Sequence, residues 1–228
     1  MKSYKLIHHL IDLVQKMEEE NNGTEVSVQD FTGFLLTHVN DPVDADLSVG
    51  DVRFGGQEDN AQEIAFQLDN NISRLFIYMS RYAKSYIKKA LDGTPLQSAE
   101  EFTCLAILLT HDHLSKTELI NRNLLEKTSG TEVIRRLIAA GLVNQWDNLK
   151  DKRSKQIGIT DEGKELLYRV FVDMNNVGKM ITGKLTVAEK LTLQYLLQKL
   201  EDFHYEHHEK KTIATKADLK AFAEESAR

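Results

Sequence analysis

The sequence contains little cysteine or proline and no long apolar run, and each absence excludes a class of protein. Cys104 is the one cysteine among 228 residues, so an internal disulfide is excluded, as is typical of the reducing cytoplasm. The two prolines, Pro42 and Pro95, leave long stretches free to form helices. No stretch approaches the about 18 uninterrupted apolar residues of a membrane-spanning helix. Residues 1–20 are amphipathic and soon acidic and lack a small-residue cleavage site, so no signal peptide is expected.

Signatures of catalysis and of metal binding are also missing. The sequence has no Gly-rich phosphate loop, no nucleophile elbow and no well-placed pair of carboxylates, so we expect neither an enzyme nor a cofactor. His204 and His208 lie four residues apart near Glu201 and His207, which is a possible zinc-ligand spacing. The alternative is an exposed helix end, where histidine suits the negative end of the helix dipole. We favour the second interpretation and predict no metal site.

Charge is unevenly distributed along the chain. The net charge is −6, which by itself argues against a polyanionic partner. Residues 1–60 carry −8, whereas residues 115–160 carry nine Lys or Arg against five Asp or Glu. The segments 61–114 and 161–228 carry −1 each. Because DNA binding requires a local positive surface, residues 115–160 are where we expect DNA to bind, with the acidic N-terminal part facing away.

Two helix starts are predicted within residues 115–159. Ser115 with Glu118, and Ser129 with Glu132, have the spacing of a capping box. In this motif the hydroxyl accepts from the third amide of the helix, and the carboxylate accepts from the amide of the cap. The 14-residue separation of the two boxes leaves room for a short helix, a tight turn and a second helix.

A basic hairpin is predicted to follow the second helix. Gly141 can adopt the left-handed conformation that ends a helix. Strand-like runs at 142–146 and 156–159 then flank a loop rich in Lys and Arg. Two helices followed by such a hairpin predict a winged helix-turn-helix, and DNA binding is the function that this fold most often serves.

The second helix divides into an apolar and a polar face. At helical periodicity the apolar arc holds Val133, Ile134, Leu137 and Ile138. The outward arc holds Thr131, Glu132, Arg135, Arg136 and Ala139. The small residues Thr128, Ser129 and Gly130 near its start would let the backbone approach a phosphate or the major-groove floor. The alternative is an amphipathic helix whose outer face is only solvated.

The hairpin loop concentrates positive charge. Lys150, Lys152, Arg153 and Lys155 are opposed only by Asp151. Beside a recognition helix, a loop tip of this kind can reach the neighbouring minor groove, where arginine is favoured. Asp151 is placed to brace Arg153. A merely solvated charged loop is the alternative.

Residues 98–168 resemble the MarR family of bacterial transcription regulators. The resemblance rests on LIAAGLV at 137–143, Asp-Lys-Arg-Ser at 151–154 and Ile-Thr-Asp-Glu-Gly at 159–163. In that family these positions are the end of the recognition helix, the wing tip and the start of a long dimerisation helix. This chain departs from the pattern in having a single Asp-x-Arg copy in the wing and Gly130 where a β-branched residue is common.

The resemblance implies a homodimer with two recognition helices about 34 Å apart, on a near-palindromic operator in double-stranded DNA. It also implies a possible small-molecule effector, for which the aromatic residues Phe76, Tyr78, Tyr82 and Tyr86 could line a pocket; core packing is the alternative. Some similar proteins sense oxidants through a cysteine of the first family helix. Cys104 lies in another helix, so we expect it to be a small buried hydrophobe.

Further helices are predicted on both sides of this lobe. Apolar periodicity places them at 3–20, 27–40, 60–91, from 98, 161–180 and 187–208. Their predicted caps are Ser27 and Thr160, with capping boxes at Ser98–Glu101 and Thr186–Glu189. Residues 1–56 would form an N-terminal helical hairpin extension and linker. Residues 57–97 with 161–228 would form a helical dimerisation region, and residues 98–160 the winged helix-turn-helix lobe. The fold class is therefore mostly α with a small β-hairpin wing.

The sequence thus predicts a cytoplasmic, homodimeric DNA-binding regulator, most simply a repressor, with no membrane association. The predicted DNA-binding residues are Ser115, Lys116, Thr128, Ser129, Gly130, Thr131, Glu132, Arg135, Lys150, Asp151, Lys152, Arg153 and Lys155. The alternative function is a winged-helix scaffold for protein interaction that does not bind DNA, with the acidic N-terminal helices as its docking surface.

Overall fold

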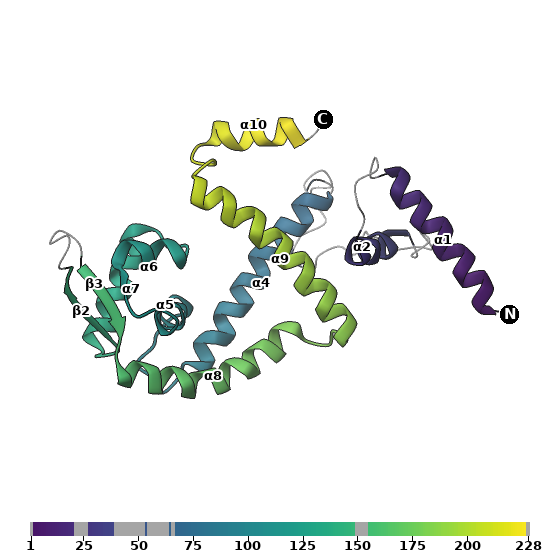
Figure 1. The fold of residues 1–228 in the computed structure, drawn as a ribbon. Coiled ribbons are helices and arrows are strands. Elements are labelled where there is room, and N and C mark those ends of the chain that lie inside the picture. The colour runs from purple at the N-terminus through teal and green to yellow at the C-terminus, as the bar shows by residue number, and fades with distance from the viewer. Residues whose placement is uncertain are drawn as a thin grey trace. The chain divides into compact units, whose positions relative to one another are not determined.

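The computed structural model describes residues 2–20, 27–38, 53, 64, 67–148 and 155–226. The chain divides into two compact units: Ser48–Gly183, and a second made of Met1–Leu47 with Lys184–Arg228. Helices dominate the described residues, and the described strands form one small antiparallel sheet (Figure 1). The predicted fold class is confirmed.

The unit Ser48–Gly183 contains the winged helix-turn-helix. In chain order its elements are α4 (Leu68–Ala90), α5 (Ala99–Leu109), β1 (Leu114–Ser115), α6 (Lys116–Arg122), α7 (Lys127–Ala139), β2 (Val143–Asp147), β3 (Lys155–Ile159) and α8 (Asp161–Thr182). Helices α6 and α7 form the helix-turn-helix, and β2 with β3 form the wing beside them (Figure 1). The long helix predicted from residue 60 is α4; residues 60–63 lie outside the described residues.

The sheet has β3 at its centre. Strand β2 pairs antiparallel with it, so that Val143 lies opposite Ile159. On the other side β1 pairs antiparallel, with Leu114 opposite Ile157. Strand β1 was not predicted from the sequence, because two residues are too few to show an alternating pattern.

Four of the predicted helix caps are confirmed, among them Ser27, whose hydroxyl accepts from the Asp30 amide at 3.1 Å. The Ser115 hydroxyl accepts from the Glu118 amide at 3.2 Å, and the Glu118 carboxylate accepts from the Ser115 amide at 2.7 Å. Hydrogen bonds to the Glu118 carboxylate from the side chain and the backbone amide of Ser115 hold the pKa of Glu118 below its usual range. The Thr160 hydroxyl caps α8 by accepting from the Gly163 amide, and Thr186 forms a complete capping box at the start of α9 (Val187–Lys210).

Two predicted caps differ from the structure. Ser98 caps α5, but the Glu101 carboxylate accepts from the Gln97 amide at 2.5 Å, so the box is incomplete. Helix α7 begins at Lys127, three residues before the start that the Ser129–Glu132 spacing predicts, and that capping box does not form. Two residues three positions apart can form a capping box at a helix start, but within a helix they simply lie on the same face. Ser129 and Glu132 are of the second kind and are exposed on one face of α7.

The core of this unit lies where α5, α6, α7 and α8 meet the sheet. Its fully buried side chains are Cys104, Leu105, Leu108, Leu119, Ile134, Leu137, Val143, Ile157, Leu167 and Val170. Burial raises the pKa of the Cys104 thiol to about 11, which keeps it protonated and unreactive at neutral pH. The prediction that Cys104 is a buried hydrophobe is confirmed.

Helix α4 packs on α8 but buries none of its residues completely. Its apolar stripe stays half exposed: Ile72, Leu75, Phe76, Met79 and Tyr82 are 42–49% accessible. In a single chain these side chains therefore neither fill a core nor line the pocket described below.

The second unit is entirely helical in its described residues. It consists of α1 (Lys2–Glu20), α2 (Val28–His38), α9 (Val187–Lys210) and α10 (Lys216–Ser226). Helix α1 packs against α2, with Leu13 and Met17 buried. Helix α2 packs against α9 of the same chain, where the Tyr195 hydroxyl donates to the Asp30 carboxylate at 2.9 Å and Lys199 lies 3.5 Å away. The N-terminal extension is thus attached to the C-terminal helices.

The histidines near the end of α9 contact aromatic and hydroxyl groups. The His207 ring lies 4.5 Å from the Phe203 ring, and its Nδ1 lies 2.5 Å from the Thr212 hydroxyl. Within the described ranges no three His, Cys, Asp or Glu side chains converge as metal ligands would. None of the described helices combines the length and apolarity that crossing a membrane requires.

Candidate nucleic-acid interface

The geometry of the helix-turn-helix is set by a close approach of α6 and α7. Gly130 is buried there, and a Cβ at this position would lie 2.6 Å from Cγ1 of Ile120. Only glycine permits this separation. In the turn between the helices Leu124 has φ +52°, and the side-chain Nδ2 of Asn123 donates to the Glu100 carbonyl and to Cys104 Sγ, both at 3.1 Å. These contacts fix the orientation of α7 on the core.

Gly130 therefore does not belong to the exposed surface, where the sequence prediction placed it among the DNA-binding residues. It faces α6 and not solvent, because it lies within α7, three and four residues before Val133 and Ile134, and so continues the buried face of the helix. This close packing against Ile120 explains why the chain has glycine at position 130 and not the β-branched residue that is common there in the MarR family.

The remaining predicted residues of α7 share one exposed face. Thr128, Ser129, Thr131, Glu132 and Arg135 all lie there. The Thr131 hydroxyl donates to the Lys127 carbonyl at 2.7 Å, which leaves its oxygen able to accept. The face thus presents hydroxyl groups and one guanidinium, which are groups that can hydrogen-bond to phosphates and base edges.

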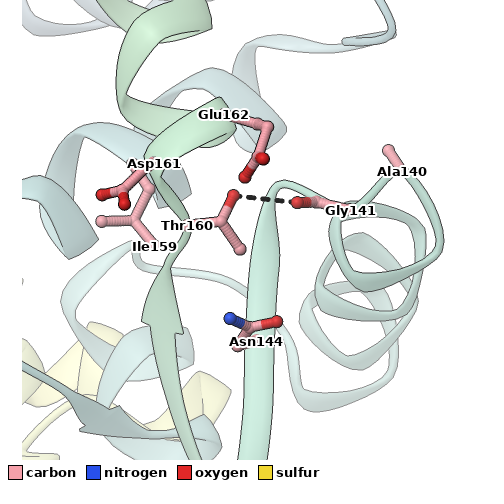
Figure 2. Close-up of a pocket in the computed structure, with 7 residues that line it drawn as sticks. All are labelled: Ala140, Gly141, Asn144, Ile159, Thr160, Asp161 and Glu162. Carbon is pink, nitrogen blue, oxygen red and sulfur yellow. Dashed lines mark hydrogen bonds between the residues drawn. The ribbon is translucent and has the colours of Figure 1, made fainter.

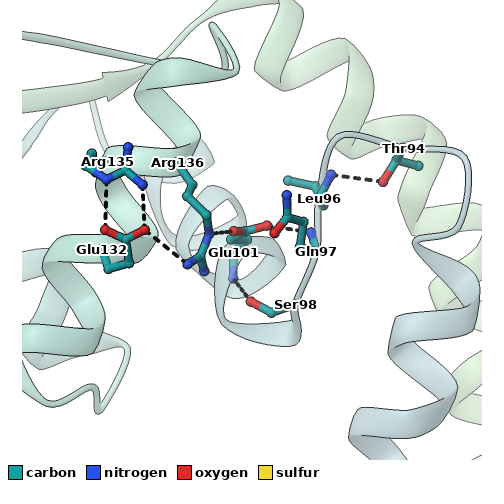
Figure 3. Close-up of polar contacts among 8 residues, drawn as sticks. All are labelled: Thr94, Leu96, Gln97, Ser98, Glu101, Glu132, Arg135 and Arg136. Carbon is teal, nitrogen blue, oxygen red and sulfur yellow. Dashed lines mark hydrogen bonds and ion pairs between the residues drawn. The ribbon is translucent and has the colours of Figure 1, made fainter.

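Glu132 and Arg135 form a two-bond ion pair on this face (Figure 3). Nε and Nη2 of Arg135 donate to the two Glu132 carboxylate oxygens at 2.8 and 2.7 Å. These bonds hold the pKa of the Glu132 carboxyl below its usual range, so it is ionised at neutral pH. Sequence analysis assigned both residues to DNA binding but did not predict that they pair.

Arg136 has a different role from its neighbour. Its Nε donates at 2.5 Å to Glu101, a carboxylate that is only 2% exposed, and its Nη1 lies 3.6 Å from Glu132 (Figure 3). A buried charge is costly unless it is paired, so this contact joins the start of α5 to the recognition helix. The sequence pattern placed Arg136 on the outward arc and gave no sign of its buried partner 35 positions earlier.

Ser115 and Lys116 lie at the start of α6 and are partly buried. The Ser115 hydroxyl and amide are both used in the capping box described above. These two residues are separate from the exposed face of α7, and their predicted role in binding DNA stays a prediction.

Strand β2 of the wing is largely exposed, whereas the middle of β3 is buried. Four of the five residues of β2 are exposed, and Lys155 at the start of β3 forms an ion pair with Asp147 directly opposite. Lys150, Asp151, Lys152 and Arg153, the predicted tip, lie outside the described residues. Trp146 was predicted to lie in a strand but not among the DNA-binding residues; it is 43% exposed and has His113 edge-on to its ring at 6.1 Å.

One pocket of about 550 Å³ lies between the end of α7 and the start of α8 (Figure 2). The Thr160 hydroxyl donates to the Gly141 carbonyl at 2.8 Å, and a Cβ on Gly163 would lie 2.4 Å from the Leu142 carbonyl oxygen. These contacts join β2 to α8 tightly. Asp161 and Glu162 line the pocket, and their negative charges would oppose a phosphate there.

The comparisons with known proteins agree with this geometry. Residues 98–155 match the model of the MarR family. This segment is therefore similar to the winged helix-turn-helix of the MarR family. Over 122 residues it is 25% identical to the HTH-type transcriptional repressor NicR of Pseudomonas putida, a match that covers 54% of this chain and 76% of that protein.

Solved MarR-type structures share the fold. A MarR protein from Peptoclostridium difficile is 26% identical with a TM-score of 0.58, and the match covers 63% of this chain and 94% of that one. An E. coli MarR variant complexed with operator DNA is 24% identical with a TM-score of 0.51 over 59% of this chain and 98% of that one. BpsR of Bordetella bronchiseptica, described as regulated in DNA binding by 6-hydroxynicotinic acid, is 20% identical with a TM-score of 0.54 over 57% and 98%. This chain therefore has a substantial part beyond the length of these MarR-type relatives.

Proposed function

We propose that this chain is a transcription regulator that binds a near-palindromic operator in double-stranded DNA as a homodimer and acts as a repressor. The observation that carries the proposal is the exposed face of α7, which presents Thr128, Ser129, Thr131 and Arg135 beside a basic hairpin. A helix of this kind fits the major groove, and Arg153 of the wing would reach the adjacent minor groove. Lys150, Lys152 and Lys155 would contact phosphates.

The relatives support the direction of regulation and an effector. NicR is named a repressor, and BpsR is described as responding to a hydroxylated pyridine carboxylic acid. By this likeness we propose that a small aromatic acid releases the chain from its operator. The exposed aromatic residues of α4 are candidates for contacting it once a second chain covers them.

Exposed apolar rows support the homodimer. Leu193, Leu196, Leu197 and Leu200 recur at the spacing of one helical face in α9, and each is 40–43% accessible. Tyr195 and Lys199, which contact α2, lie on a neighbouring face of the helix. The leucine row is thus uncovered by α2 and available to a second chain. A contiguous apolar surface of this kind usually marks an interface.

DNA binding is tested by measuring the affinity for genomic fragments at several salt concentrations. A dimer that makes about 6 to 10 phosphate contacts should lose ~10³ to 10⁵-fold in affinity between 50 and 200 mM salt. The variant Arg153→Ala should bind more weakly, whereas Arg169→Ala, which removes an exposed arginine of α8, should bind like the wild type. No retarded fragment, or an affinity that salt does not change, would instead favour the protein-interaction scaffold.

A further inference from the structure

The geometry of Arg135 indicates what it can recognise. Its pair with Glu132 uses one edge of the guanidinium, the edge that carries Nε and Nη2. Nη1 contacts no acceptor among the described residues, so the end of the fork, formed by Nη1 and the second hydrogen of Nη2, is available. With 67% of its side chain exposed, Arg135 presents that end to solvent from the middle of the exposed α7 face. A guanidinium fixed on one edge is thus oriented before any ligand arrives.

Glu132 is itself held in place. Nη1 of Arg136 lies 3.6 Å from Oε1 of Glu132, the oxygen that also accepts from Nη2 of Arg135, and Arg136 is anchored by the buried Glu101. Glu101 in turn accepts from the Gln97 amide at the start of α5. Charges of alternating sign therefore run from the core to the tip of Arg135 (Figure 3). Since each carboxylate has a fixed partner, the position of the exposed guanidinium depends on the core.

We propose that Arg135 reads a guanine in the major groove and that Glu132 is the positioning residue that braces it. The inference rests on the proposed function. Two parallel N–H groups at the end of a guanidinium match the adjacent O6 and N7 acceptors of guanine, which no other base presents as a pair. A phosphate suits this site less well, because the ionised Glu132 lies in direct contact with Arg135 and would repel it. The base edge carries no such charge.

The experiment is selection of bound sequences from a random double-stranded DNA library by the full-length chain, followed by affinity measurements on single-base variants of the selected site. The wild type should select a symmetric site with one guanine fixed in each half. At that position it should prefer guanine about ten-fold over other bases. Arg135→Met should lose this preference and retain the rest of the motif.

Glu132→Gln keeps the size of the side chain and removes the charge that braces Arg135. It should lower the preference for guanine several-fold while leaving affinity for non-specific DNA equal or higher, because a negative charge facing DNA is removed. Glu165→Gln is the matched control: it removes a charge from an exposed glutamate of α8 and should leave the motif unchanged. A simple loss of folding would not shift preference at one base pair.

The possible results distinguish failure of guanine recognition by Arg135 from failure of the proposed function. If Arg135→Met weakens binding to all sequences equally and lowers the salt dependence by about one ion, Arg135 contacts a phosphate and the guanine reading is overturned. If Glu132→Gln behaves like Glu165→Gln, its role as a brace is overturned. If the wild type selects no sequence at all, the proposed function itself fails, and the guanine reading with it.

Discussion

At the residue scale, Gly130 controls how closely α6 and α7 can pack. The variant Gly130→Ala should be less stable, because its methyl group would lie 2.6 Å from the buried Ile120, which is stiff at Cβ. Overpacking costs about 1 to 3 kcal/mol, against a gain of about 1 kcal/mol in helix propensity. Denaturant unfolding should therefore show a net loss of up to about 2 kcal/mol.

Gly178 offers the matched control for this prediction. It lies within α8, and an added methyl group would have no neighbouring atom within 4 Å, so Gly178→Ala should gain up to about 1 kcal/mol in stability. Equal effects of the two substitutions would show that the approach of the two helices is not limited by residue 130.

The pairing of Arg136 with Glu101 is the second prediction at this scale. Arg136→Met leaves a carboxylate that is 2% exposed with only the Gln97 amide as partner. We expect a loss of about 2 to 3 kcal/mol in the free energy of unfolding, less than for a fully buried pair because the Arg136 side chain is 32% exposed. Adding Glu101→Gln should restore part of that loss, since the unpaired charge is then removed. Thermal or urea unfolding of both variants measures this, and no recovery in the double variant would contradict it.

At the element scale, Asp30 joins α2 to α9. Hydrogen bonds from Ser27 and from Tyr195, with the charge of Lys199, lower the pKa of Asp30 from 3.8 to about 2. A carboxyl with a lowered pKa stabilises the fold above its unfolded pKa, and the contribution disappears as the pH falls through the folded pKa. The contact should therefore be fully present above about pH 4 and be lost towards about pH 2.

Asp30→Asn should remove this part of the pH dependence. Melting temperatures followed by circular dichroism between about pH 5 and pH 2 should fall less steeply in the variant than in the wild type. Tyr195→Phe removes a single hydrogen bond and should give an intermediate slope. Identical slopes for all three proteins would mean that Asp30 does not hold the two helices together.

At the scale of the whole molecule, the exposed leucine row of α9 implies assembly. Leu196→Glu places a charge in the centre of that row, where a second chain would have to bury it at a cost of several kcal/mol. Sedimentation should show dissociation to monomers, and operator affinity should fall because each half-site would bind alone. Gln194→Glu adds the same charge on an exposed polar position of α9 and should remain dimeric. A Leu196→Glu variant that stays dimeric would place the interface elsewhere.

The charge distribution has a consequence at the same scale. With −8 in residues 1–60 and a net excess of positive charge only in residues 115–160, a regulator of this kind binds DNA through one face. The steep salt dependence expected of the affinity for DNA thus comes from the positive residues within 115–160 and not from the net charge of the chain.

The sequence alone was sufficient for the local features. Capping residues at Ser115, Thr160 and Thr186, the left-handed Gly141 and the apolar periodicity predicted the helices and the wing, because each depends on residues only a few positions apart. The predicted start of α7 was wrong, because the Ser129–Glu132 spacing fits both a capping box and a helical face. Strand β1 was missed because its two residues are too few to form a pattern.

The roles of Gly130, Glu101 and Arg136 were decided only by the tertiary structure. Each depends on a partner in another helix: Ile120 against Gly130, and Glu101 against Arg136 from 35 positions away. Helical periodicity reports which side of a helix is polar, but it cannot distinguish an arginine that faces solvent from one that reaches a buried carboxylate. That distinction arises when α5 and α7 pack, since only then is the carboxylate removed from water and a charged partner required.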